Sequence, residues 1–291
     1  MILNEKEIFT RNIESLALRS LLYEVSASPK PGLVDRNNNG AHNDMDFYTF
    51  IDSSSVLGET FYHCTLTGIE HKDSSKTLLK AIRPFGIRGE KKMFAITNNV
   101  NTHKGLVFSL GIICAAIGYL YQKKPNRRWH ANDICEQVKY MTEGLVEREL
   151  MNKNFKNPVT YGEKLYIKYG VTGIRGEVTS GFQTVLNHGL PILKELMESR
   201  VGTFNDRLVQ TLLNLMTHTE DSNILGRHNL DMLKRVQNEA KRIIELGGIF
   251  SPEGIKAIKE FDNWCIKHWV SPGGSADLLA VTIMLFLIEK L

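Results

Sequence analysis

Apolar residues recur at intervals of three and four residues through most of this 291-residue chain. This spacing lines up apolar side chains on one face of an α-helix, and convincing strand-like alternation is missing. Two clear sets are Ile13, Leu16, Ala17, Leu21, Val25 and Leu106, Leu110, Ile113, Cys114, Ile117. Similar patterns cover Phe47 to Phe61, Ile134 to Leu145, Val185 to Leu196, Leu208 to Met216, Leu233 to Leu246, Ile255 to Ile266 and Ser275 to Leu291. The chain is therefore predicted to be all-α, with roughly ten helices.

Length and composition favour one folded unit. Hydrophobic residues make up 42% and charged residues 23%, as in ordinary soluble proteins, and neither a linker nor an internal repeat interrupts the pattern. We expect a single compact domain over residues 1–291. The formal charge of +4 is small, so we expect anionic small molecules as partners and no nucleic acid.

The chain carries no clear targeting or membrane signal. Glu5, Lys6 and Glu7 interrupt the apolar stretch that a signal peptide would need. The apolar stretch over residues 278–288 is 11 residues long, well short of the roughly 20 needed to cross a bilayer. The four cysteines are far apart and are expected to be reduced core residues. We therefore expect a cytoplasmic protein without a membrane span.

Five segments rich in Asp, Gly, Asn, His, Lys and Arg lie at the edges of the helical patterns. The first spans residues 28–46 and contains two prolines, which exclude a continuous helix. Its Asp44 and Asp46 either bind one Mg²⁺, or Asp44 caps the next helix while Asp46 favours the helix dipole. Lys30 and Arg36 are either phosphate ligands or surface charges.

The second segment, residues 97–105, precedes a strongly apolar helix. The free N–H groups of that helix, together with Lys104 and the small Gly105, would suit a phosphate. The alternative is that Thr102 caps the helix while His103 and Lys104 are exposed. Within the helix, a run of small residues indicates close packing against a neighbouring helix: Gly111, Ala115, Ala116 and Gly118.

The other three segments offer further charged candidates. Residues 161–177 hold Arg175, a fork for phosphate, and Gly170, which alternatively only ends a helix. Residues 218–227 place Asp221 near Arg227, a weak signal alone. Residues 271–277 begin the last helix, where Asp277 faces either a cofactor or the free N–H groups of the first turn.

Together these segments resemble the triphosphoribosyl-dephospho-coenzyme A synthase family. The matching motifs are S-x-x-P-K-P-G-L-V-D-R and N-G-A-H-x-D-M within residues 26–45, N-T-H-K-G at 101–105, Y-G-E-K-L-Y and G-I-R-G-E within 161–177, D-S-N-I at 221–224 and S-P-G-G-S-A-D-L at 271–278. They follow one another in order along nearly the full chain. The product of this family is the prosthetic-group precursor of citrate lyase and, in a close relative, of malonate decarboxylase.

The resemblance implies that the 2'-hydroxyl of 3'-dephospho-CoA attacks the anomeric carbon of ATP, with loss of adenine and retention of the triphosphate. An active site built from inter-helix loops and helix N-termini would then need Mg²⁺, carboxylates and phosphate-binding cations. We predict catalytic roles for Asp46, Asp221 and Asp277. The sequence leaves open which of the three is the general base. The predicted Mg²⁺ ligands are Asp44, Asp46, Asp221 and Asp277, and the predicted phosphate-binding residues are Lys30, Arg36, His103, Lys104, Arg175 and Arg227.

Two short stretches depart from the family pattern. Asn98 and Asn99 stand where a glycine pair is usual, and His228 and Asn229 stand where glycines are common. Because asparagine tolerates positive φ better than most residues, we expect the loop to keep its shape.

Two other functions stay open at this stage. A Mg²⁺-dependent N-glycoside hydrolase would also expel adenine, with water as the acceptor, and a nucleotide sensor would bind ATP without turnover. As partners, the resemblance implies ATP, 3'-dephospho-CoA and a carrier-protein prosthetic-group transferase that receives the product. Assembly as a homodimer is a further hypothesis.

Overall fold

The computed structural model describes residues 4–125, 127–151 and 160–291, and these residues form helices and loops without any strand. The all-α prediction is therefore confirmed. The α-helices are α1 (Glu5–Ser26), α2 (Phe47–Ser55), α3 (Gly58–Glu70), α4 (Leu78–Ile96), α5 (Lys104–Lys123), α6 (Ala131–Met141), α7 (Tyr161–Tyr169), α8 (Ile174–Ser180), α9 (Leu190–Ser199), α10 (Phe204–Met216), α11 (Ser222–Arg227), α12 (Leu230–Glu245), α13 (Pro252–Lys267) and α14 (Gly273–Ile288). Short 3₁₀ or π turns cover Ser75–Thr77, Glu147–Met151, Val185–Gly189 and Gly248–Phe250.

The described residues hold more helices than the roughly ten expected. Helix α4 lies outside every apolar pattern named from the sequence, and two other differences add to the number. The pattern from Phe47 to Phe61 was expected to be one helix, but the chain turns after Ser55 and starts α3 at Gly58. Leu57 in this turn is fully buried, so the break does not interrupt the apolar pattern. Three short helices, α7, α8 and α11, also form inside segments expected to be loops.

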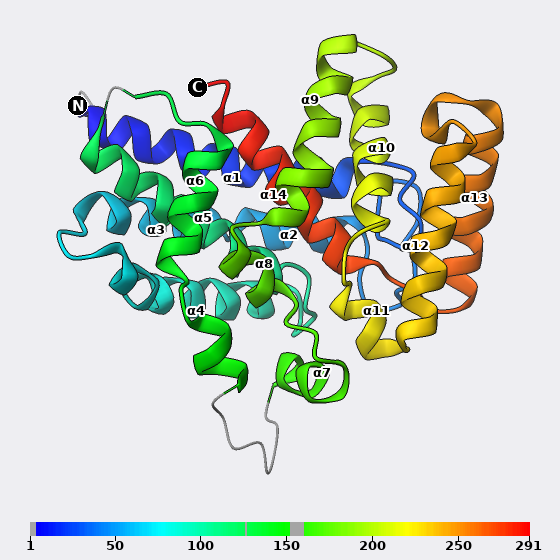
Figure 1. Cartoon of the computed structure of the whole chain (residues 1–291), viewed down its shortest axis with the longest axis horizontal. Helices are drawn as coiled ribbons and strands as arrows, with labels where there is room; N and C mark the ends of the chain where they lie inside the picture. The colour runs from blue at the N-terminus through cyan, green and yellow to red at the C-terminus, as the bar shows by residue number, and fades with distance from the viewer. Residues whose placement is uncertain (1–3, 126, 152–159) are drawn as a thin grey trace.

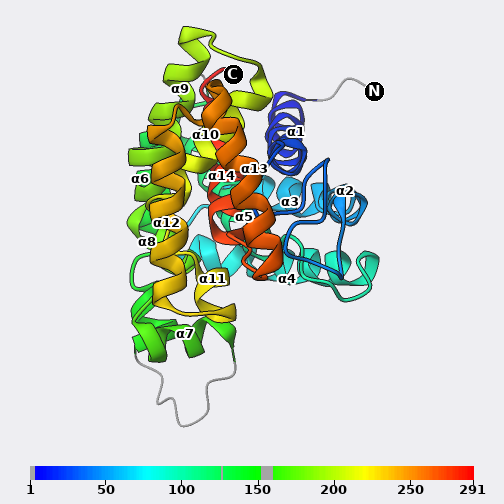
Figure 2. The same ribbon diagram turned by 90° about the vertical axis from the view of Figure 1, so that its right-hand side faces the viewer.

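Helix α5 lies at the centre of the molecule, with α3 and α4 on one side (Figures 1 and 2). A Cβ at Gly68 of α3 would lie 2.2 Å from the carbonyl oxygen of Ala115, and a Cβ at Gly118 would lie 2.2 Å from that of Thr65. These glycines therefore let the two helix backbones approach closely. The predicted close packing of the small residues in this helix is confirmed.

Helix α5 is also long and apolar enough to cross a membrane, judged by length and composition alone. Most of it is buried inside the protein, where it contacts α3, α4, α6 and α14. Helix α14, equally apolar, is buried beside it. Both are therefore core helices of one continuous cluster of buried residues that runs from Ile13 to Ile288.

The remaining helices surround this core. Helices α12 and α13 form an outer pair at one end of the molecule, and α7 lies at its lower edge in Figure 1. The four cysteines are buried and free of disulfides, as expected. Burial raises the pKa of the Cys64 thiol to about 12, so this thiol is protonated and unreactive at neutral pH.

Candidate active site

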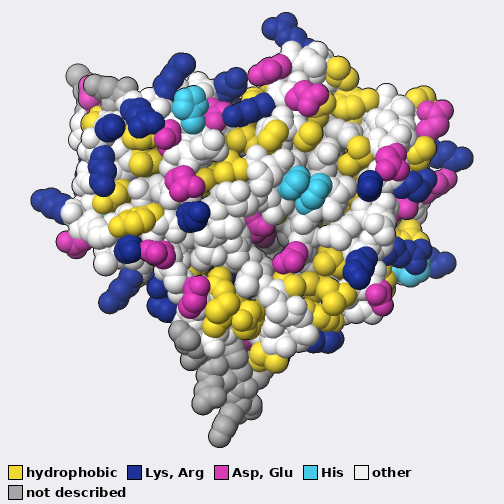
Figure 3. Space-filling view, in the orientation of Figure 1, with side chains coloured by type: hydrophobic (Ala, Val, Ile, Leu, Met, Phe, Trp, Pro, Cys, Tyr) yellow, Lys and Arg dark blue, Asp and Glu magenta, His cyan; other side chains and the backbone are white. Residues whose placement is uncertain are grey.

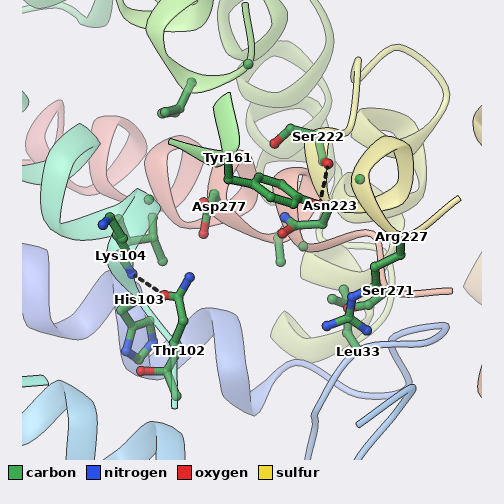
Figure 4. A pocket seen from close by; sticks show the side chains of 18 of the residues that line it. Leu33, Thr102, His103, Lys104, Tyr161, Ser222, Asn223, Arg227, Ser271 and Asp277 are labelled. Atoms are coloured by element: carbon green, nitrogen blue, oxygen red, sulfur yellow. Dashed lines mark hydrogen bonds between the residues drawn. The ribbon is translucent and has the colours of Figure 1, made fainter. Parts of the chain in front are cut away.

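A cavity of about 750 Å³ opens where the polar segments meet. The end of α1, the loop before α2 and the starts of α5, α7, α11 and α14 all contribute to its wall. Its charged side chains are four cations and three carboxylates: Lys30, Lys104, Arg175, Arg227, Glu24, Asp44 and Asp277. Figure 4 shows Lys104 and Arg227 on opposite sides of the cavity, with Asp277 between them.

The loop between α1 and α2 is folded around Asp35. The Asp35 carboxylate accepts hydrogen bonds from the Ser28 hydroxyl at 2.9 Å and from the backbone N–H of Lys30 at 2.8 Å. A second carboxylate, Asp262 of α13, accepts from the backbone N–H of Gly32 at 2.9 Å. The shape of this loop therefore depends on buried carboxylates, and the loop places Lys30 at the cavity.

Lys30 forms a buried ion pair with Glu24 of α1. The Lys30 and Glu24 side chains are only 1% and 3% exposed, so bulk water does not solvate either charge. Burial raises the pKa of Glu24, while the Lys30 ammonium partly offsets that rise. A buried pair of this kind holds its geometry, because removing one partner would leave an uncompensated charge.

The N-cap residue of α5 makes no side-chain cap hydrogen bond, and the first N–H of the helix, that of Lys104, donates to the Asn101 side-chain oxygen at 3.3 Å. Thr102, the alternative cap, instead donates its hydroxyl hydrogen bond to Ser53 at 2.7 Å, and His103 stands at the N-cap position. The Thr102 alternative is therefore wrong. The Lys104 side chain reaches Glu90 at 3.1 Å on an exposed surface, a weak pair that a bound phosphate could displace.

His103 is fully buried and lines the cavity. Because Thr102 donates to Ser53, Ser53 in turn donates to His103 Nδ1 at 2.7 Å, which leaves the ring proton on Nε2. Nε2 has no hydrogen-bond partner within the described part of the chain. Burial, with a smaller contribution from Lys30, lowers the His103 pKa to about 3, so the ring is a neutral donor at physiological pH.

Asp277, the fifth residue of α14, rests against the first turn of α5. A Cβ added at Gly105 would lie only 2.0 Å from Asp277 Oδ2, so this approach requires glycine. Burial, followed by the nearby Glu24 and Asp221, raises the Asp277 pKa well above that of an ordinary aspartate. Asp277 therefore contacts α5 and faces the cavity.

At the start of α14, Asp221 rather than Asp277 accepts a hydrogen bond from a free backbone N–H group. Its Oδ2 accepts from the backbone N–H of Ser275 at 2.9 Å, and its Oδ1 accepts from Asn223 and Ile224 at the start of α11. The dipole alternative for Asp277 is therefore wrong. Asp221 is 1% exposed and does not line the cavity.

The other two cations of the cavity are Arg227, on the side opposite Lys104 in Figure 4, and Arg175. Arg227 donates to the Ala41 carbonyl at 3.2 Å, and Arg175 donates from Nε to Glu149 at 2.8 Å. Gly170 ends α7 with φ of +72°, which confirms the helix-ending role predicted as the alternative for this glycine. Asp44 lines the cavity at its exposed edge and lies 3.6 Å from His42.

Two predicted residues besides Asp221 lie away from the cavity. Asp46, rather than Asp44, caps α2: its carboxylate accepts from the Thr49 N–H and hydroxyl, both at 2.8 Å. These hydrogen bonds lower the Asp46 pKa. Arg36 is exposed and donates to Asn205 at 3.0 Å. Of the ten predicted residues, the fold thus brings together Lys30, Asp44, His103, Lys104, Arg175, Arg227 and Asp277.

The predicted Mg²⁺ ligands are not gathered in one place. Among the residues that the structure describes, no group of three or more His, Cys, Asp or Glu side chains is arranged to hold a metal ion. Asp46 and Asp221 are engaged as helix caps, whereas Asp277 keeps its oxygens toward the cavity. Because Mg²⁺ commonly takes one or two carboxylates plus substrate phosphates, Asp277 still fits a metal that arrives with a nucleotide.

Glu24 was missed by the sequence reasoning, yet a signal existed. It lies three residues after Leu21 and one before Val25, both in the apolar stripe of α1, and is 2% exposed. A charged residue in such a stripe needs a buried partner. That partner, Lys30, lies in a loop whose path the helical pattern does not specify.

The departures at 98–99 and 228–229 have different structural outcomes. Asn98 and Asn99 adopt φ of +52° and +66°, so the expected glycine-like loop is kept. His228 and Asn229 have negative φ, and Asn229 caps α12 by accepting from Met232 at 2.9 Å. The backbone at residues 228–229 therefore does not need positive φ.

The fold and cavity define an all-helical protein with a mixed acidic and basic pocket that suits a polyphosphate-bearing small molecule. On the face shown in Figure 3, basic and acidic side chains are interspersed, without the continuous basic patch of a nucleic-acid binder. Residues 10–291 match the family described as CitG, ATP:dephospho-CoA triphosphoribosyl transferase. The chain belongs to this family of transferases.

Relatives of known name agree with this membership. A probable 2-(5''-triphosphoribosyl)-3'-dephosphocoenzyme-A synthase of Malonomonas rubra is 40% identical over 280 residues, which cover 96% of this chain and 88% of the relative. One of the same name from Lactiplantibacillus plantarum is 41% identical, covering 95% and 96%. Protein CitXG of Leuconostoc mesenteroides subsp. cremoris is 40% identical over 94% of this chain and 58% of its own length. No solved structure matches the chain.

Proposed function

We propose that this protein, folded as one domain, transfers the triphosphoribosyl group of ATP to the 2'-hydroxyl of 3'-dephospho-CoA and releases adenine. A new C–O bond forms at the anomeric carbon as the C–N bond to adenine breaks. The electron pair of that bond leaves with adenine, which takes up one proton, and the proton of the hydroxyl passes to a base. The observation that supports this proposal best is Asp277, a carboxylate on the cavity wall between basic side chains.

Asp277 is proposed as the general base. Its burial and its carboxylate neighbours Glu24 and Asp221 raise its pKa, so the ionised form is more basic than an exposed aspartate. A carboxylate beside the ribose would also stabilise the positive charge that develops at the anomeric carbon. Asp221 and Asp46, predicted from sequence as catalytic, are proposed instead to position helices.

The triphosphate is proposed to lie at the start of α5. There Lys104 and the Nε2–H of His103 can reach it, with Arg227 on the facing wall. Preorganised donors of this kind hold the phosphates while the sugar reacts at the other end. Lys30 contributes indirectly, because its ammonium pairs with Glu24 near Asp277 and offsets part of the rise that burial causes in the Glu24 pKa.

Mg²⁺ is proposed to enter with ATP and to be held by Asp277 and, at the cavity edge, Asp44. The ion would neutralise part of the triphosphate charge. Titrating metal-free protein and ATP with Mg²⁺ should reveal binding by calorimetry that is weakened in Asp277→Asn. Equal affinities in the two proteins would contradict the assigned ligand.

The decisive experiment is a product assay. Incubation with ATP and 3'-dephospho-CoA should release adenine in step with a mass gain of the acceptor equal to the triphosphoribosyl group. With ATP alone, adenine should not accumulate. Adenine release without the acceptor would indicate an N-glycoside hydrolase, and binding of ATP without any adenine release would indicate a sensor.

We further propose that the product supplies the prosthetic group of citrate lyase, the malonate decarboxylase relative being the alternative, through a carrier-protein transferase in the cytoplasm. The product can be incubated with the apo carrier protein of citrate lyase or of malonate decarboxylase, each with its transferase. We expect one of the two carrier proteins to acquire the prosthetic group. Assembly as a homodimer stays a prediction that light scattering can test. Neither nucleic acid nor a membrane is proposed as a partner.

A further inference from the structure

A second, smaller cavity of about 290 Å³ lies next to the first. Helices α4 and α5 form its sides, and most of its wall is apolar, including Ile82, Ile87, Val107 and Phe108. The two cavities share four residues: Lys104, Gly105, Ile174 and Arg175. The smaller cavity is therefore a mainly apolar side chamber that joins the proposed active site at a neck with two cations, each paired with a carboxylate: Lys104 with Glu90 and Arg175 with Glu149.

We propose that this chamber binds the pantetheine arm of 3'-dephospho-CoA, an inference that rests on the proposed function. Of the two substrates, only the acceptor has a long uncharged part, with a dimethyl carbon, two amides and a thiol. ATP has no group of that kind, because its tail is fully charged. The apolar wall therefore selects the acceptor.

The charges at the neck agree with this orientation. The arm is attached to a diphosphate, which would lie at Arg175 where the cavities meet, in place of the Glu149 carboxylate that Arg175 now contacts, while Lys104 holds the ATP triphosphate. The ribose on the other side of that diphosphate would then lie in the main cavity. Asp277 packs on Gly105 at the same neck, so the proposed base lies on the side where the ribose 2'-hydroxyl would be.

Two glycines keep the chamber open. A Cβ added at Gly86 of α4 would meet no atom within 4 Å, and one added at Gly111 of α5 would meet only the Cys64 sulfur, at 3.5 Å. Both residues line the chamber. Side chains there would grow into the space that the arm needs without displacing protein atoms. Glycine is also a poor residue inside a helix, so a larger residue at position 86 favours the helix.

The test is Gly86→Leu, with Gly86→Ala as a graded variant. We expect Gly86→Leu to raise the KM for 3'-dephospho-CoA at least about tenfold, Gly86→Ala to raise it less, and the KM for ATP to stay within about twofold in both. The matched control is Lys80→Leu, which adds the same side chain to an exposed position of α4 outside the chamber. It should leave both KM values unchanged.

A second measurement uses the unaltered protein and does not depend on a variant folding. The probe is 4'-phosphopantetheine, which contains the arm and one phosphate. It should inhibit competitively against 3'-dephospho-CoA but not against ATP, and Gly86→Leu should weaken this inhibition at least about tenfold. Equal effects on both substrates, or a fully active Gly86→Leu protein with an unchanged acceptor KM, would overturn the proposal. Failure of the proposed function is distinct, because the unaltered protein would then make no triphosphoribosylated product.

Discussion

The carboxylate of Asp221 accepts a hydrogen bond from the backbone N–H of Ser275, 54 residues later in the chain, at 2.9 Å. Through its other oxygen, Asp221 also caps α11. One buried side chain thus fixes the start of α11 relative to the start of α14. Arg227 at the end of α11 and Asp277 in α14 both line the cavity, so their separation depends on this carboxylate.

Asp221→Ala should therefore be primarily a stability variant. Loss of the caps on two helices is expected to lower the free energy of unfolding by about 2–3 kcal/mol, measured by urea denaturation. Asp46→Ala is the matched control: it removes one partly exposed cap, should cost about 1 kcal/mol and should keep most turnover. An Asp221→Ala protein with normal stability and no turnover would return Asp221 to the catalytic residues.

Asp277→Asn should have the opposite effect on stability. Because burial and nearby carboxylates raise the Asp277 pKa in the folded protein, the folded state holds this proton more tightly than the unfolded chain does. Folding is therefore penalised as pH rises from the unfolded pKa through the folded one. Above that range Asp277→Asn should unfold at higher urea than the unaltered protein, while its turnover falls at least about a hundredfold. A destabilised Asp277→Asn protein would contradict the stated cause of the shift.

The Glu24 and Lys30 pair invites a double-mutant cycle. Glu24→Gln alone leaves a buried ammonium without its partner and should cost about 3–5 kcal/mol of unfolding free energy. The double change Glu24→Gln with Lys30→Met removes both charges and should recover most of that loss. If the double variant were no more stable than the single one, the pair would not be coupled in the way its burial indicates.

His103 should contribute to acid sensitivity. Its folded pKa of about 3 lies below the ordinary histidine value, so the unfolded chain takes up a proton between these two pH values while the folded protein does not. Stability is therefore complete above the unfolded pKa and is lost as pH falls toward 3. Unfolding measured from pH 7 to pH 4 should decline less steeply for His103→Gln than for the unaltered protein. Identical slopes would show that His103 is not buried in its neutral form.

Lys104→Ala should fold normally and bind ATP poorly. The side chain is 54% exposed and pairs with Glu90 near the surface, so its removal should change thermal stability little. Loss of a charge aimed at the triphosphate should lower kcat/KM for ATP about a hundredfold, with partial recovery in Lys104→Arg. Steady-state kinetics with near-normal kcat/KM would remove Lys104 from the phosphate site.

The amino-acid sequence by itself determined the helical class, because the three- and four-residue apolar spacing is a local property that each segment carries alone. It also carried the motifs that placed the chain in its family, and the tolerance of Asn98 and Asn99 for positive φ. Only the tertiary structure decided which polar residues meet. Asp46 and Asp221 became helix caps, Arg36 stayed outside the cavity, and Glu24 joined Lys30 inside it. The physical reason is that loop side chains from distant segments meet only where packed helices bring them, and no local spacing encodes that packing.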